Sequence, residues 1–460
     1  MRSVFRILVS VLCLSFFIAP ARAVIPPDRI VVMISVDGLA AYYIDDPKAE
    51  MPNIRALAEA GARAASMKAS TPTVTWTNHA TLATGDNPAR HGVVGNNYFD
   101  RATGKPVQLI SDPIFDKDQI LKVPTIYDLA KAAGLRTAGI RWPVTRGAKN
   151  LDWTFPDVAD NDILHKYTTP ALYDEAVKAG IWADGEPQGG SDSKVRIVSD
   201  EMCTAVFLHI LQHHQPNLAL LHLIDVDHVE HLSGPRSPEA YAAIKKDDQE
   251  VGQVWEELKK DYPDKATLIV VSDHGFSPIE KAILPNVILR QADLVEVKGI
   301  RVVAGSVRIV TQGGSILLYI TDEKNHDQIV DRVRKAFEGV EGVSKVVDSS
   351  EFKSYGVADP KDDPHAPDMI IFAKEGYNFG DTAAGAIPFN AKPERKGSHG
   401  HEAEISDLHA TFVAWGVGIQ PGARLGEIQN IDVAPTLAKL LDISMPDVDG
   451  KPLAAVLSKK

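Results

Sequence analysis

The chain has 460 residues, of which 44% are hydrophobic and 24% charged, and this composition excludes a disordered or fibrous protein. The formal net charge of −12 argues against binding to nucleic-acid polymers or anionic membranes, because both need a positive surface. The two cysteines, Cys13 and Cys203, cannot form a disulfide framework.

The first 23 residues have the pattern of a secretory signal peptide. Arg2 and Arg6 precede an apolar run over residues 7–18, and the small residues at 21–23 form a cleavage pattern. The run is shorter than the roughly 20 residues of a membrane span, and no later stretch reaches that length. We therefore predict cleavage after Ala23 and a periplasmic or secreted protein without a membrane span, with a cleaved but envelope-associated protein as the alternative.

From Arg29 onward, short apolar runs alternate with segments of helical spacing. Residues 30–36 form a nearly continuous apolar run that ends in Asp37-Gly38, as expected of a buried parallel strand. Further helices are predicted at residues 51–61, 124–134, 198–214 and 238–260, and further strands at 135–142, 218–224 and 266–271. This alternation predicts an α/β fold with a mostly parallel central sheet flanked by helices.

Residues 283–372 have a different pattern. Two alternating runs, 301–310 and 315–320, flank Gly313-Gly314. A helix at 328–337 and short strands near 343–347 and 369–372 follow. We predict a small α+β cap inserted into a core formed by residues 24–282 and 373–460, with a strand at 410–415 and a closing helix at 432–441. Residues 143–199 form a second excursion without assigned contacts.

Carboxylates and imidazoles follow several of the predicted strands. They occur at Asp37, in segments 225–231 and 272–275, and in segment 397–401 before the final strand. Ligands bind outside the carboxyl ends of strands in open α/β sheets, and these side chains suit zinc. We therefore expect a site for two metal ions, against the alternative that the residues are unrelated caps and turns.

A threonine-rich segment supplies a candidate nucleophile. Residues 70–80 turn into a short helix that reaches Thr84, so a hydroxyl near its start would lie beside free backbone N–H groups. Coordination to a metal is one way to activate such a hydroxyl. The alternative is a strand with period-two polarity and an N-cap. Asn96 follows in a glycine-punctuated turn, and its amide could donate to a phosphoryl oxygen.

Together these segments resemble the nucleotide pyrophosphatase/phosphodiesterase family of the alkaline phosphatase superfamily, from about Arg29 to Pro452. The matching elements are Ser-x-Asp-Gly at 35–38, Thr-Trp-Thr-Asn-His at 75–79, Asp-x-x-x-His at 227–231 with Gly-Pro at 234–235, Ser-Asp-His-Gly at 272–275 and Gly-x-His-Gly at 397–400.

The resemblance implies an alkaline-phosphatase-like fold and a two-zinc phosphodiesterase or nucleotide pyrophosphatase that acts on a small phosphate ester. It implies that Thr75 is the nucleophile, forming a covalent phosphothreonine, and that Asn96 contacts the phosphate. The implied ligands of one zinc ion are Asp227, His231 and His399, and those of the other are Asp37, Asp273, His274 and the Thr75 oxygen.

Some positions depart from the family pattern. Trp76 replaces a common Phe, and we interpret it as a substrate-stacking residue with packing as the alternative. His222 stands where members that cleave nucleotides commonly have Tyr, and this weakens the case for a nucleotide. A phosphonoacetate-type hydrolase or a phosphomonoesterase of the same superfamily stays open, the latter because of Arg146. An alternative of another class is a non-catalytic periplasmic metal- or phosphate-binding protein. Sulfatases are disfavoured because Cys203 lacks their motif.

Overall fold

The computed structural model describes residues 29–158, 160–182, 199–390 and 393–458. The predicted signal peptide, residues 1–23, lies outside these ranges. Among the described residues, no helix combines the length and apolar character that crossing a membrane requires.

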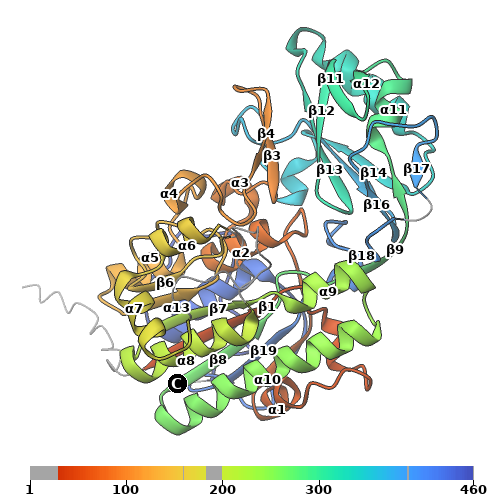
Figure 1. Cartoon of the computed structure of the whole chain (residues 1–460). Coiled ribbons are helices and arrows are strands. Elements are labelled where there is room, and N and C mark those ends of the chain that lie inside the picture. The colour runs from red at the N-terminus through yellow and green to blue at the C-terminus, as the bar shows by residue number, and fades with distance from the viewer. Residues whose placement is uncertain (1–28, 159, 183–198, 391–392, 459–460) are drawn as a thin grey trace, which may run out of the picture.

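An eight-stranded sheet forms the centre of the molecule, as predicted (Figure 1). The strands, in order across the sheet, are β20 (Arg424–Gln429), β2 (Ala62–Lys68), β19 (Phe412–Gly416), β8 (Ala266–Val271), β1 (Ile30–Val36), β7 (Leu218–Leu223), β5 (Thr137–Ile140) and β6 (Trp153–Phe155). Neighbours pair in parallel except at β19, which is antiparallel to both β8 and β2. The sheet is therefore mostly parallel.

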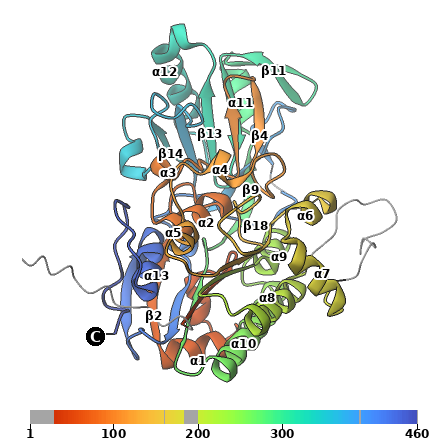
Figure 2. The same ribbon diagram turned by 90° about the vertical axis from the view of Figure 1, so that its left-hand side faces the viewer.

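Helices cover both faces of this sheet, and the central strand β1 is therefore buried on both sides. Even-numbered residues of β1 such as Val32 pack in one apolar cluster, and the odd-numbered Val31 and Met33 pack in another. The helices of the first face include α1 (Pro52–Ala60), α7 (Pro170–Lys178), α8 (Asp200–His214) and α10 (Pro238–Asp261). Those of the second include α2 (Thr75–Thr84), α5 (Ile126–Ala132) and α13 (Val433–Leu441). Figure 2 shows these two layers on opposite sides of the sheet.

A second group of strands lies beyond one end of the sheet (Figure 1). Its largest sheet has the order β12 (Val307–Thr311), β13 (Ser315–Ile320), β15 (Met369–Ala373) and β14 (Val343–Asp348). Around it lie the helices α11 (Pro285–Gln291) and α12 (His326–Phe337), the pair β10 (Val295–Lys298) and β11 (Arg301–Gly305), and β9 (Ser277–Ile283) with β16 (Gly376–Phe379), β17 (Phe389–Asn390) and β18 (Gly397–Ser398). The strands β9, β16, β17 and β18, which flank the predicted cap of residues 283–372 in the sequence, also lie outside the central sheet.

Among the described residues, the remaining strands and α-helices are a hairpin and four shorter helices. They are the hairpin of β3 (Asn97–Asp100) and β4 (Lys105–Gln108), and the helices α3 (Pro88–His91), α4 (Lys117–Ile120), α6 (Asn161–Tyr167) and α9 (Asp225–Ser233). Helices α6 and α7 fall within the excursion at 143–199.

Candidate active site

The carboxyl ends of three adjacent parallel strands bring most of the predicted site residues together. Asp37 directly follows β1, and Asp273 and His274 follow β8. After β7 the chain enters α9, which places Asp227 and His231 one turn apart on that helix. Because β7, β1 and β8 are neighbours in the sheet, these side chains meet at one edge, as expected of an open α/β fold.

Asp37, Asp273 and His274 form one buried group whose ligand atoms lie within 4.8 Å of one another. The Nε2 atom of His274 lies 3.5 Å from Oδ1 of Asp37 and 3.1 Å from Oδ2 of Asp273. The hydroxyl of Thr75 lies 3.4 Å from the same Nε2 atom. The predicted nucleophile thus faces the group that the resemblance assigns to it.

A second group surrounds Asp227 and is contiguous with the first. The Oδ1 atom of Asp227 lies 3.5 Å from Nε2 of His231 and 3.4 Å from Nε2 of His399. The rings of His399 and His274 stack with their centroids 3.8 Å apart, and Asp227, His274 and His399 also fall within one 4.8 Å cluster. All seven predicted ligands therefore lie in one site, arranged as two contiguous groups.

The three site imidazoles share an orientation that suits metal ligation. Each has its Nδ1 atom within hydrogen-bond distance of a backbone carbonyl: His231 at 3.1 Å from Gly397, His274 at 3.1 Å from Gly275 and His399 at 3.0 Å from Thr73. A carbonyl can only accept, so the proton lies on Nδ1 and the lone pair of Nε2 faces the carboxylates. Such outer hydrogen bonds are typical of histidines that bind metals.

The charges of the site also favour a cation. Burial and the neighbouring charges of Asp273 and Asp227 raise the pKa of Asp37 well above its usual range. Burial and the charge of Asp273 raise the pKa of Asp227 to about 8. Burial lowers the pKa of His231 to about 3, so its imidazole is neutral at neutral pH. The guanidinium of Arg395, whose Nη1 atom lies 3.4 Å from Nδ1 of His231, is a positive group beside these carboxylates and imidazoles, and it leaves the pKa of Asp227 raised; divalent metal ions would supply further positive charge.

Helix α2 positions the nucleophile and an anion-binding surface. It begins at Thr75, which confirms the predicted turn from the threonine-rich loop into a helix. The first N–H groups of a helix carry partial positive charge and favour anions. The Oδ1 atom of Asn96 accepts a hydrogen bond of 2.9 Å from the backbone N–H of Trp76, which leaves the amide nitrogen of Asn96 for another acceptor.

The stacking interpretation of Trp76 needs correction. Its side chain is 1% exposed and packs in an apolar cluster with Val93 and Val144. The indole N–H donates to Asp112 at 2.9 Å. A ring covered on both faces cannot stack on a substrate, so the burial favours the packing alternative.

The contacts that His222 and Gly38 make at this site were not predicted from the sequence. His222, noted only as a departure from the family pattern, lies with Nε2 3.0 Å from Oδ2 of Asp37 and with Nδ1 3.0 Å from the carbonyl of Arg141. Gly38 has a φ of +75°, and a Cβ atom there would lie 3.1 Å from the Cα atom of Asp227. The close approach of β1 to α9 therefore depends on glycine.

The turn between β12 and β13 joins the cap to the site. The buried side chain of Gln312 accepts a hydrogen bond of 3.0 Å from the backbone N–H of Asn96 and donates one of 2.8 Å to the carbonyl of Asn97. In the same turn, the N–H of Gly314 donates to the carbonyl of His399 at 2.7 Å. These partners are more than 80 residues apart in sequence, so no local pattern indicates the contact.

Arg146 does not face this site. Its guanidinium group bonds to the Oδ1 atom of Asp116 at 2.9 Å and to the carbonyls of Asp112 and Ile114 at 3.0 and 2.6 Å. All three nitrogens of the guanidinium therefore have partners in the 112–116 loop, which holds the group toward that loop.

Curated relatives share partial sequence similarity with this chain. An uncharacterized pyrophosphatase/phosphodiesterase of Schizosaccharomyces pombe is 30% identical over 251 residues, which cover 54% of this chain and 45% of the relative. Human ectonucleotide pyrophosphatase/phosphodiesterase family member 1 is 25% identical over 436 residues, or 92% of this chain and 41% of the relative. The chain thus spans less than half the length of these relatives.

The fold is similar to solved structures of murine and human ectonucleotide pyrophosphatase/phosphodiesterase 5. Both have a TM-score of 0.69 and cover 94% of this chain and all of the solved chain, with 20% and 21% identity. The murine protein has also been solved as an inactive variant in complex with AMP, with the same score. The profile of the family described as type I phosphodiesterase/nucleotide pyrophosphatase matches residues 31–402. The chain belongs to the type I phosphodiesterase/nucleotide pyrophosphatase family.

Proposed function

We propose that the protein is a metal-dependent phosphodiesterase of the nucleotide pyrophosphatase type, which hydrolyses small phosphate diesters through a covalent phosphothreonine at Thr75. The observation that carries this proposal is the buried Thr75 hydroxyl, 3.4 Å from Nε2 of His274 at the start of α2. A hydroxyl needs activation to act as a nucleophile, and a cation held by these ligands would provide it. A protein that only binds metal or phosphate has no use for a hydroxyl in this position.

The donor set suits two zinc ions. One ion would be held by Asp37, Asp273, His274 and the Thr75 oxygen, and the other by Asp227, His231 and His399. When bound, the pair supplies positive charge for the phosphoryl oxygens and lowers the pKa of a hydroxyl or water.

The chain itself orients the substrate and accepts the phosphoryl group. The amide nitrogen of Asn96 donates to an equatorial oxygen, where negative charge develops, and the partial positive charge at the start of α2 favours the same oxygens. The bond from Thr75 Oγ to phosphorus forms as the bond to the leaving alcohol breaks. Water then hydrolyses the phosphothreonine and restores the hydroxyl. The polar groups are already in place, so little reorganisation accompanies the reaction.

Three observations narrow the substrate. The AMP complex of the murine relative supports a nucleotidyl group as one half of the diester. Arg146 is held by three hydrogen bonds to the 112–116 loop, and this disfavours its use as a monoesterase residue. The net charge of −12 argues against a nucleic-acid polymer as the substrate.

The predicted signal peptide at residues 1–23 supports a location in the periplasm or outside the cell, and we propose that the enzyme acts there.

The Thr75→Ala variant tests the mechanism, with Thr75→Ser as its matched control. We expect Thr75→Ala to lose turnover while it keeps the parent's melting temperature, and Thr75→Ser to keep measurable turnover and to give a phosphoserine in acid-quenched samples. Full turnover by Thr75→Ala would disprove a covalent mechanism at this residue.

A comparison of substrates tests the reaction class. Rates would be measured on para-nitrophenyl phosphate, its phenyl diester and a dinucleotide, with zinc titrated into each assay. We expect the two diesters to be hydrolysed faster than the monoester. A strong preference for the monoester would refute a diesterase, and no turnover of any substrate would favour a binding protein.

A further inference from the structure

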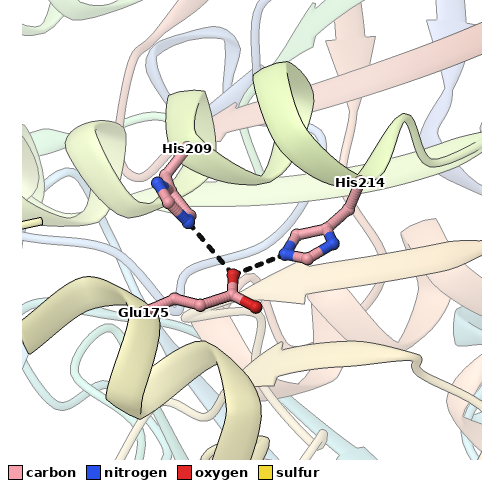
Figure 3. Close-up of side chains that lie close together, drawn as sticks. All are labelled: Glu175, His209 and His214. Carbon is pink, nitrogen blue, oxygen red and sulfur yellow. Dashed lines mark hydrogen bonds and ion pairs between the residues drawn. The ribbon is translucent and has the colours of Figure 1, made fainter. Parts of the chain in front are cut away.

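Three potential metal ligands meet at the opposite edge of the sheet from the proposed active site. Glu175 lies on α7, and His209 and His214 lie in the last turns of α8. Figure 3 shows both imidazoles turned toward one carboxylate oxygen. The Nε2 atoms of His209 and His214 lie 3.0 and 2.6 Å from Oε2 of Glu175, and one ligand atom from each residue falls within 4.8 Å of the others.

This cluster is separate from the phosphate site. Helix α8 ends at His214, shortly before β7 begins at Leu218, so the cluster lies at the amino end of β7. Asp227 and its neighbours follow the carboxyl end of the same strand. A strand of six residues spans roughly 20 Å, and no ion could contact both groups.

The cluster has the chemistry of an open zinc site. Two imidazoles and one carboxylate are a common zinc donor set, with a fourth position left for water. The side chains of His209, His214 and Glu175 are 14%, 19% and 34% exposed, so an ion and its water can reach them from solvent. The carboxyl end of α8 carries partial negative charge, which also favours a cation.

The surrounding residues hold the ligands in place. The ring of His214 stacks on Trp153 with centroids 4.6 Å apart and an interplanar angle of 24°. The exposed ring of His213 lies beside that of His209, with centroids 4.4 Å apart, but His213 contributes no ligand atom to the cluster. Burial tends to raise the pKa of Glu175, but the hydrogen bonds from His214 and His209 outweigh it and lower this pKa, so the carboxylate is ionised at neutral pH.

Without a metal, the same contacts are hydrogen bonds from two Nε2–H groups to one carboxylate. Binding of an ion requires that each Nε2 atom release its proton, so that the ring carries a proton on Nδ1 alone. We propose that Glu175, His209 and His214 form a second metal site, for Zn²⁺ or a divalent ion of similar chemistry, that links α7 to the end of α8. This site does not depend on the proposed function.

Metal content measures this site directly. The parent and the double variant His209→Gln/His214→Gln would be stripped with a chelator, reloaded with Zn²⁺, passed through a desalting column and analysed for zinc. Gln can still donate to Glu175, so the fold should be kept. The matched control is His213→Gln, which changes an exposed histidine of the same turn.

We expect the parent and His213→Gln to hold one more zinc equivalent per chain than the double variant. We also expect the double variant to keep the parent's diester turnover when zinc is saturating. Equal zinc contents in the parent and the double variant, or equal loss in His213→Gln, would overturn the proposal.

Anomalous diffraction at the zinc edge provides a test without substitutions. Crystals of the parent loaded with Zn²⁺ should show a peak between the three side chains in addition to any peaks at the phosphate site. A structure with zinc at the phosphate site but no peak here would contradict the second metal site, even if the double variant failed to fold.

Discussion

Asn96 is held in one orientation by its neighbours. A backbone N–H can only donate, so the contact of 2.9 Å from Trp76 fixes the amide oxygen of Asn96 on that side. The amide nitrogen is thereby directed away from this contact and can act as a donor. The backbone N–H of Asn96 is itself bound by Gln312 at 3.0 Å. Because the donor is oriented before substrate arrives, it stabilises developing charge at little cost.

The Asn96→Asp variant separates the donor from the structural contact. Aspartate can still accept from the Trp76 N–H, but it cannot donate to a phosphoryl oxygen. We expect kcat on a diester to fall about 100-fold or more, as in other enzymes that lose one such donor, with an unchanged melting temperature. Asn96→Ala is the control for the added negative charge. Unchanged kcat in both variants would contradict a role for this amide.

The predicted ligands and nucleophile depended on motifs that are local in sequence, such as Asp227 and His231 one helical turn apart. All seven ligands were predicted in this way, and the structure places them in one site. The roles of His222 and Gln312 depend on contacts between distant segments, which spacing along the chain does not reveal. Trp76 was misinterpreted because sequence alone cannot separate a buried ring from an exposed one.

At the scale of elements, the strands and helices that have continuous apolar runs or clear cap residues were predicted well from the sequence. The run at residues 30–36 coincides with β1, and the predicted helix at 238–260 is α10. The edge strand β20 and its neighbour β2 were missed because their residues are largely polar or half-exposed. The predicted strand at 301–310 is instead two strands in different sheets, broken near Gly305, which has a φ of +125°.

The turn between β12 and β13 is expected to influence catalysis through Asn96. Replacing Gln312 with Ala removes both hydrogen bonds to the 96–97 backbone, so the Asn96 amide should lose its fixed position. We expect kcat to fall about tenfold or more, which corresponds to roughly 1.4 kcal/mol of transition-state stabilisation. The control is Gln108→Ala, an exposed glutamine of β4, which should behave as the parent.

A double-mutant cycle distinguishes this role from a general loss of stability. If Gln312 acts through Asn96, then Gln312→Ala should reduce kcat much less in an Asn96→Ala background than in the parent. Independent, additive effects of the two substitutions would show that the turn does not act through Asn96.

Helix α10 contains a carboxylate that should make stability depend on pH. Asp247 is 1% exposed, and neither of its oxygens has a hydrogen-bond partner within the described residues. Burial, with the charges of Asp200 and Asp225, raises its pKa well above the usual range. The folded protein therefore holds a proton that the unfolded chain releases near pH 4, so this group's contribution to stability decreases as pH rises.

The Asp247→Asn variant removes this dependence. Relative to the parent, we expect its free energy of unfolding to increase with pH between about pH 5 and pH 8, by at most about 1.4 kcal/mol per pH unit. Urea unfolding at several pH values measures this difference. Glu256→Gln, an exposed change on the same helix, should show no such trend. A difference that is constant with pH would contradict a protonated Asp247.

At the scale of the whole molecule, the protein is acidic, with a net charge of −12, yet the proposed substrate is an anion. The carboxyl groups of Asp37, Asp227 and Asp273 converge at the carboxyl ends of the central strands, and a metal would displace the protons that Asp37 and Asp227 hold there. Bound cations therefore have to reverse the local charge before a phosphate ester can bind. Metal loading should consequently control both stability and substrate binding.

The stabilisation by zinc should increase with pH. In the metal-free protein the pKa of Asp227 is about 8, above its ordinary value, so metal has to displace a proton at lower pH, whereas His231, with a pKa of about 3, is already neutral. In the His209→Gln/His214→Gln background, which isolates the phosphate site, we expect the rise in melting temperature on adding Zn²⁺ to be larger at about pH 8 than at about pH 6. Asp227→Asn should weaken this trend. A rise that is equal at both pH values would show that carboxylate protons do not compete with the metal.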